Sequence, residues 1–241
     1  MPKKENIHQL FDSISPEYDR LNHILSMDID KIWRKKAVRK IISGNNGESE
    51  TAGQPLHILD VACGTGDFSI AIAGQMPEGS HVTGIDLSEG MLAIMDGKIR
   101  KAGMQDQISW MQGDCEALPF DDCTFDRVSV AFGVRNFENR EKGLKEMLRI
   151  LKPEGRLVIL ELSVPSNRIL RWLFNLYFLN ILPLVGGKVS GDKAAYKYLP
   201  ASVLNFPDKK SFMKTLTDCG YREVSHKAFS MGICRMYTGE K

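Results

Sequence analysis

The 241-residue chain lacks several features that would direct its interpretation elsewhere. Its five cysteines form no C-x-x-C pair, which favours a reducing compartment over a disulfide framework. A net charge of +2 gives no bias toward nucleic acid, so no such partner is expected. No run of 18 purely apolar residues is present, and the N-terminus turns polar at once. We therefore expect neither a membrane-spanning helix nor a secretory signal, and a cytoplasmic protein.

The chain does have a regular alternation of strand-like and helix-like segments from residue 56 onward. Strands alternating with helices predict parallel pairing with right-handed crossovers, hence a doubly wound α/β sheet. The expected strands are 57–62, 81–86, 108–114, 125–132 and 155–162, with helices near 67–75, 88–102 and 138–151.

The flanking segments depart from this alternation. Residues 1–42 read as helices, and 43–55 form a polar linker. Residues 164–206 are an aromatic and aliphatic insertion, with five Lys or Arg and one Asp. Residues 207–241 predict a helix and two strands in an antiparallel hairpin. The expected fold is a seven-stranded sheet with an antiparallel last strand, an N-terminal helical cap and an inserted helical lid.

The stretch LDVACGTGDF, residues 59–68, lies between the first strand and its helix. Ligands of open α/β sheets bind beside such loops. The NAD fingerprint needs a third glycine, but the chain has Ser69 in that register. A phosphate-binding loop needs GK[ST] after four residues, and none is present. The loop therefore favours a ligand that is neither a dinucleotide nor a nucleotide triphosphate.

Two aspartates end the next strands of the predicted sheet. Asp86 can accept hydrogen bonds from both ribose hydroxyls, and Asp114 with the next backbone N–H can bind an adenine edge. Alternatively, each aspartate only caps a strand end or a helix. The ordered set favours a class I S-adenosylmethionine (SAM) methyltransferase, with no metal. The predicted cofactor-binding residues are Cys63, Gly64, Thr65, Gly66, Asp86, Leu87, Asp114 and Cys115.

Further segments resemble the UbiE/MenG family of quinone-biosynthesis methyltransferases over nearly the whole chain. They are FDSISPEYDRLNHILSMDIDKIWR, AFGVRNFENR, RILKPEGRLVILELS, GDKAAYKYLPASVLNFP and GICRMYTG. Three positions depart from the family pattern: Asp30 replaces a histidine, Glu154 replaces a glycine, and Ala131 replaces a serine. The SAM-binding role of that serine is therefore not carried over to Ala131.

The resemblance implies a single methyltransferase domain over residues 1–241, with SAM-binding core 56–163, substrate-side insertion 164–206 and closing segment 207–241. The implied reaction methylates a ring carbon of lipid-soluble demethylmenaquinol and releases menaquinol and S-adenosylhomocysteine. The equivalent step of ubiquinone biosynthesis remains an alternative, because no residue separates the two rings. A noncatalytic SAM-binding subunit of a quinone-biosynthesis assembly is a third interpretation.

Arg135 and Asn136 follow the fourth strand, beside the expected position of the transferred methyl group. The ring carbon becomes nucleophilic when a ring hydroxyl loses its proton, so the site must accept that proton or stabilise the phenolate. Arginine stabilises a phenolate, and asparagine orients a hydroxyl. We therefore predict catalytic roles for both residues. The alternative is that Arg135 caps a helix and Asn136 satisfies a loop.

The substrate-side candidates are Tyr18, Asp19, Asn22 and Tyr196. The N-terminal residues among them form either a lid over the cofactor or a plain polar helix face. The insertion 164–206 suits a groove for a polyprenyl tail or an interfacial helix that contacts the cytoplasmic face of the membrane. An ordinary core helix and a homodimer interface are the alternatives.

Overall fold

The computed structural model describes residues 10–13, 15, 18–19, 26, 28–43, 53–181 and 193–241. Asn22 and most of the predicted linker lie outside the described residues. Tyr196 lies in a described helix, but its side chain is not among those described.

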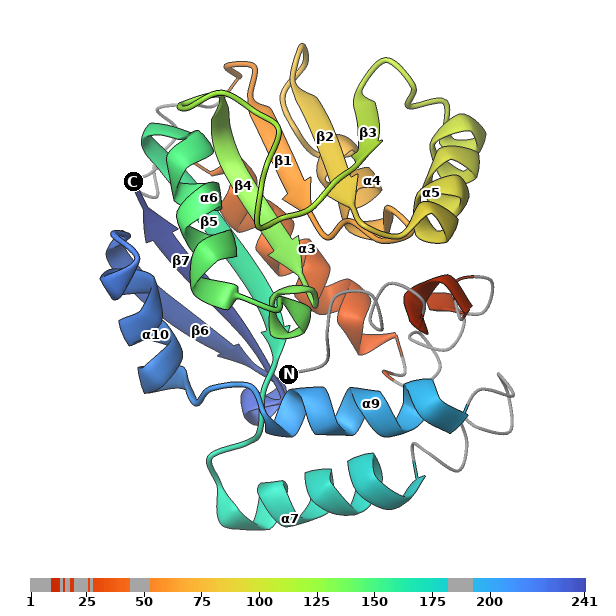
Figure 1. Cartoon of the computed structure of the whole chain (residues 1–241), viewed down its shortest axis with the longest axis vertical. Helices are drawn as coiled ribbons and strands as arrows, with labels where there is room; N and C mark the ends of the chain where they lie inside the picture. The colour runs from red at the N-terminus through yellow and green to blue at the C-terminus, as the bar shows by residue number, and fades with distance from the viewer. Residues whose placement is uncertain are drawn as a thin grey trace.

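One sheet of seven strands forms the centre of the molecule, in the order β3-β2-β1-β4-β5-β7-β6 (Figure 1). Strands β1 to β5 pair in parallel, whereas β7 runs antiparallel to both β5 and β6. The predicted fold class, including the antiparallel last strand, is therefore confirmed. The strands are β1 His57–Val61, β2 His81–Asp86, β3 Ile108–Gln112, β4 Phe125–Ala131, β5 Leu151–Leu162, β6 Arg222–Phe229 and β7 Cys234–Glu240.

Both faces of the sheet are covered. Successive side chains of a strand point to opposite faces, and side chains on both faces are buried. In β5, Leu157 and Ile159 belong to one buried cluster, while Val158 and Leu160 belong to the other. Helices α6 (Arg140–Ile150) and α10 (Lys209–Asp218) cover the first face, in front of the strands in Figure 1. Helices α3 (Ile29–Ile42), α4 (Asp67–Ala73) and α5 (Glu89–Ala102) contribute to the second.

Helix α3 belongs to this core layer, although the sequence places it within an N-terminal cap. Its side chains Trp33, Val38 and Ile41 are buried against the sheet. The buried Arg156 of β5 donates to the carbonyls of Lys40 and Ser43 at 3.1 Å each. A cation is favourable there because the last carbonyls of a helix lack partners within it. The predicted cap therefore has two parts, of which the second is a core helix.

The insertion lies beyond the carboxyl ends of the parallel strands, where Figure 1 shows α7 and α9 crossing below the sheet. It contains α7 (Arg168–Leu176), the π-helix η3 (Tyr177–Ile181) and α9 (Lys193–Leu204). Phe174 and Phe178 stack at 4.2 Å between ring centroids and pack with Val203. No helix among the described residues is long and apolar enough to cross a membrane. The insertion thus covers the edge of the sheet where ligands bind in such folds.

Asp60 of β1 is a buried carboxyl group beneath the glycine loop. Its oxygens accept hydrogen bonds from the hydroxyls of Ser69, at 2.6 Å, and Ser129, at 2.9 Å. The serine found in place of a third glycine therefore ties α4 to β1. Burial raises the pKa of Asp60 to about 6, although both hydroxyls oppose the shift. Because the folded state favours the protonated carboxyl group, the contribution of Asp60 to the free energy of unfolding is complete below about pH 4. That contribution is lost as the pH rises through about 6.

The substitution Asp60→Asn should remove this pH dependence, because an amide does not ionise in that range. We compare the free energy of unfolding of the variant with that of the unchanged protein at each pH. The variant's value minus that of the unchanged protein should rise by on the order of 3 kcal/mol from pH 4 to pH 8. Urea unfolding at a series of pH values measures the difference. Ser69→Ala removes a hydrogen bond that lowers the pKa, so it should move the transition to higher pH. A difference that stays constant across the range would contradict the assignment.

Candidate functional site

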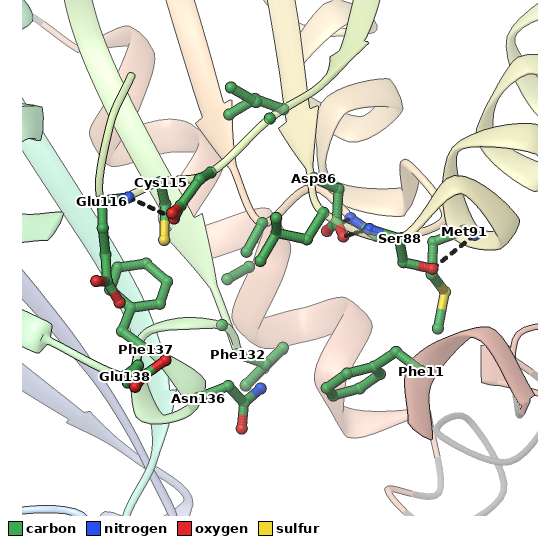
Figure 2. A pocket seen from close by; sticks show the side chains of 18 of the residues that line it. Phe11, Asp86, Ser88, Met91, Cys115, Glu116, Phe132, Asn136, Phe137 and Glu138 are labelled. Atoms are coloured by element: carbon green, nitrogen blue, oxygen red, sulfur yellow. Dashed lines mark hydrogen bonds between the residues drawn. The ribbon is translucent and has the colours of Figure 1, made fainter. Parts of the chain in front are cut away.

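A cavity of about 100 Å³ opens at the carboxyl ends of β1 to β4. Figure 2 shows Asp86 and Ser88 on one side of it, Cys115 and Glu116 on the other, and Phe132 and Asn136 toward its lower end. The cavity is lined by Phe11, Tyr18, Ala62, Gly64, Ile85, Asp86, Leu87, Ser88, Met91, Gly113, Asp114, Cys115, Glu116, Ala131, Phe132, Gly133, Asn136, Phe137 and Glu138.

The two loop glycines serve different purposes. Gly64 lines the cavity at a φ of +56°, and a Cβ built there meets nothing within 4 Å. Its missing side chain therefore lets a ligand approach the backbone. Gly66 has a φ of +81°, and a Cβ there would lie 2.5 Å from Cγ of Met95. Gly66 is thus needed for packing of the loop against α5.

Asp86 is held rigidly at the edge of the cavity. Its Oδ2 accepts from the backbone N–H of Gly64 at 2.8 Å, and its Oδ1 accepts from that of Ser88 at 2.9 Å. Each carboxylate oxygen can accept more than one hydrogen bond. Asp114 is fixed in the same way, since its Oδ1 accepts from the N–H of Glu116 at 2.8 Å. Two oriented carboxylates therefore face one cavity.

The structure brings together five of the eight predicted cofactor residues: Gly64, Asp86, Leu87, Asp114 and Cys115 line the cavity. Cys63, Thr65 and Gly66 are not among its lining residues. The thiol of Cys63 contacts Sδ of Met95 at 3.5 Å, and burial raises its pKa well above the ordinary value. Thr65 is buried, and its hydroxyl donates to Asp19 at 2.5 Å.

The described N-terminal residues attach to the loops around the cavity. Asp12 accepts from the hydroxyl of Ser88 at 2.5 Å and from the N–H of Gly90 at 3.2 Å. Asp19 binds Thr65 and forms an ion pair with Lys98 of α5, which also binds Asp67 at 2.5 Å. Phe11 and Tyr18 thereby come to line the cavity. Sequence reasoning missed Phe11 and Asp12 because no local pattern predicts which loop this segment contacts.

A second cavity, of about 390 Å³, adjoins the first. It shares Tyr18 and Phe132 with it, so these two side chains lie between the cavities. The other lining residues are mostly apolar: Ser26, Ile29, Asp30, Trp33, Arg34, Arg135, Leu162, Pro165, Leu170, Leu173, Phe174, Tyr177, Phe178, Leu199, Ser230, Met231 and Ile233. Phe132 has a φ of +59°, a conformation that is costly for a bulky residue and that surrounding contacts must hold.

The 3-10 helix η2 (Val134–Asn136) contains both predicted catalytic residues. Arg135 lines the larger cavity, whereas Asn136 lines the smaller one. The side-chain oxygen of Asn136 accepts from the hydroxyl of Tyr198 in α9 at 2.8 Å. Adjacent positions of one short helix thus contribute to adjacent cavities.

Arg135 is held by a buried ion pair with Glu161 of β5, at 2.7 Å. Its guanidinium also donates to the hydroxyl of Ser202 at 3.3 Å and to the carbonyl of Phe132. Burial alone would lower the pKa of Arg135, but the Glu161 carboxylate, together with Tyr18 and Tyr198, outweighs it and raises that pKa above the ordinary value. The wall of an apolar cavity therefore carries a permanent positive charge. Glu161 was missed because no local pattern identifies the partner of a buried arginine.

The substitution Glu161→Gln should destabilise the fold by about 3 kcal/mol, because it leaves the Arg135 charge buried without a counter-ion. Glutamine keeps one of the two oxygens, so it can still accept from the backbone N–H of Arg135 or of Leu162, which bond different oxygens of Glu161. The double variant Arg135→Met, Glu161→Gln should lose clearly less than the sum of the two single variants. Urea unfolding of all four proteins measures the coupling. Additive losses would show that the pair does not act as a unit.

The fold resembles that of known methyltransferases. A putative SAM-dependent methyltransferase from Methanococcus maripaludis superposes with a TM-score of 0.67 at 20% identity, and the match covers 100% of this chain and 95% of that one. At this identity the likeness establishes the fold alone.

Sequence comparison is more specific. The chain is 44% identical over 239 residues to a ubiquinone/menaquinone biosynthesis C-methyltransferase UbiE of Geobacter sulfurreducens, covering 99% of this chain and 90% of that one. It is 40% identical over 240 residues to a demethylmenaquinone methyltransferase of Bacteroides fragilis, covering 99% of this chain and 94% of that one. The sequence model of the ubiE/COQ5 methyltransferase family matches residues 1–241. The chain therefore belongs to the ubiE/COQ5 methyltransferase family.

Proposed function

We propose that this enzyme transfers the methyl group of SAM to a ring carbon of demethylmenaquinol, giving menaquinol and S-adenosylhomocysteine. One observation carries the proposal. A small cavity with two oriented carboxylates adjoins a larger apolar cavity, and among the described residues only Tyr18 and Phe132 line both. A polar, nucleoside-like donor and an apolar acceptor would meet at this junction.

The smaller cavity suits the adenosine of SAM. The oriented carboxylate of Asp86 would accept the ribose hydroxyls, while Asp114 and the backbone at Cys115 would bind the adenine edge. Gly64 would allow the methionine portion to approach the loop backbone. Thr65 would act on that portion through the loop's conformation, since its hydroxyl is bound to Asp19. When bound, SAM supplies an already activated methyl group, so the chain's main contribution is positioning.

The larger cavity suits the quinol ring and the start of its tail. Arg135 would stabilise the phenolate form of the ring, because its raised pKa keeps the guanidinium charged and unable to serve as a base. Asn136, fixed by Tyr198, would orient a ring hydroxyl near the donor. Tyr18 would contact both ligands, and Asp19 would hold the N-terminal segment on the glycine loop. Asn22 and Tyr196 remain predicted substrate-side residues.

The choice of the naphthoquinol ring rests on names given to relatives. Those from Bacteroides fragilis and Porphyromonas gingivalis are demethylmenaquinone methyltransferases, whereas the name of the Geobacter protein includes both quinones. The ubiquinone step is therefore the second candidate. A noncatalytic role is less well supported, because Arg135 and Asn136 flank the junction between the cavities. We further propose a cytoplasmic location, with the lipid substrate drawn from the membrane's cytoplasmic face.

The substitution Asp86→Ala should raise the dissociation constant for SAM about 100-fold, because it removes an acceptor for both ribose hydroxyls. Isothermal titration calorimetry measures the change. Glu89→Gln is the matched control, since Glu89 is an exposed acid three residues away that does not line the cavity. An Asp86 variant that folds and binds SAM normally would exclude Asp86 as the ribose acceptor.

The function itself is tested by methyl transfer from labelled SAM to reduced demethylmenaquinone, beside the corresponding benzoquinol. We expect transfer to the naphthoquinol, and transfer to neither acceptor would rule out the proposed activity.

Arg135→Ala should lower kcat about 100-fold or more while changing SAM affinity less than about threefold, because the guanidinium acts on the acceptor. Arg135→Lys keeps the charge and should retain more turnover. Equal losses of turnover and SAM affinity would indicate that Arg135 is structural.

A further inference from the structure

Helix α7 leaves an apolar face uncovered. Ile169, Trp172 and Leu176 have the spacing of one helix face, and they are 72%, 63% and 43% exposed. The helix is also apolar on its inner side, where Phe174 packs with Phe178 and Val203. An exposed apolar face of this kind indicates a contact with a partner or a membrane.

The charges on α7 have a single sign. Arg168 and Arg171 are exposed, and the helix RILRWLFNL contains no acidic residue. A short helix with apolar residues, a tryptophan and arginines is typical of segments that lie in the interface of an anionic bilayer. With nine residues, α7 is about 14 Å long, so it can lie in the interface of a bilayer but is too short to cross the bilayer.

The uncovered face is continuous with the larger cavity. Leu173 lines the cavity and is also 48% exposed, and Met231 lines it with 73% exposure. Leu170, one residue after Ile169, lines the cavity as well. An apolar path therefore leads from the outer face of α7 to the cavity wall beside Arg135.

We propose that α7 docks on the surface of an anionic lipid bilayer, with Ile169, Trp172 and Leu176 in the interface and Arg168 and Arg171 against lipid phosphates. This inference rests on the proposed function, because a quinol with a polyprenyl tail is dissolved in that bilayer. Docking would bring the cavity opening to the lipid, so that the ring enters while its tail stays in an apolar environment.

A second copy of the chain fits this face less well. A two-fold contact places the same patch on both subunits, and two α7 helices packed on each other would bring their arginines together. No acidic side chain of α7 would compensate those charges. Lipid phosphates supply the missing negative charge, which favours the bilayer as the partner.

The test is co-sedimentation of the full-length protein with vesicles of phosphatidylethanolamine and phosphatidylglycerol, without substrate. We expect binding that weakens at high salt and that falls at least about tenfold in the double variant Ile169→Gln, Trp172→Gln. Neither residue lines either of the two cavities described above, and glutamine is a good helix former. The control is Trp110→Gln, which removes an exposed tryptophan of β3. It should bind as the unchanged protein does.

A second readout separates docking from catalysis. The double variant should methylate a short-tailed quinol in solution normally, but lose activity on a long-tailed quinol held in vesicles. Vesicle binding without methylation of either quinol would support docking and contradict the proposed function. Docking would be overturned if the unchanged protein did not sediment with the vesicles, or if the double variant sedimented equally well. It would also be overturned if the protein bound no vesicles but formed a dimer, seen in sedimentation velocity, that substitutions in α7 dissociate.

Discussion

The ion pair between Arg135 and Glu161 joins the parts from which the site is built. Glu161 lies one residue before the end of β5, Arg135 lies in η2 after β4, and Ser202 of α9 binds the same guanidinium. Because both charges are buried, neither partner can turn away without leaving the other charge buried and unpaired, which is strongly destabilising. This constraint fixes the short helix, so that Arg135 and Asn136 contribute to adjacent cavities. The insertion, the sheet and the loop after β4 are thus mutually dependent.

Much of the fold could be predicted from the sequence, because its signals are local. Alternating segments predicted the doubly wound sheet, and the closing strands formed the predicted antiparallel pair. Asp86 and Asp114 were identifiable as acids at strand ends, and carboxyl ends of parallel strands share one edge of the sheet. The glycine loop was recognised by the same reasoning, although only Gly64 of its two glycines lines the cavity.

The contacts that could not be predicted join residues far apart in the chain. Thr65 was placed near the cofactor from its position between two glycines, yet its hydroxyl binds Asp19, 46 positions earlier. Ser69 looked like a missing glycine, and only the structure shows it bonded to Asp60. Helix α3 was assigned to a cap because its apolar spacing does not reveal which surface it covers. Such contacts depend on tertiary packing, which periodicity does not encode.

Arg156 binds carbonyls at the end of α3 and also Glu240 of β7, at 3.3 Å. One buried guanidinium therefore joins the first long helix described to the last strand of the sheet. Strand β7 also pairs with β5 and so covers an edge that would otherwise be open. The counter-ion of Arg156 and the edge partner of β5 thus come from one segment, residues 234–240. A single late strand completes both the buried ion pair and the sheet edge, so losing its pairing would expose both at once.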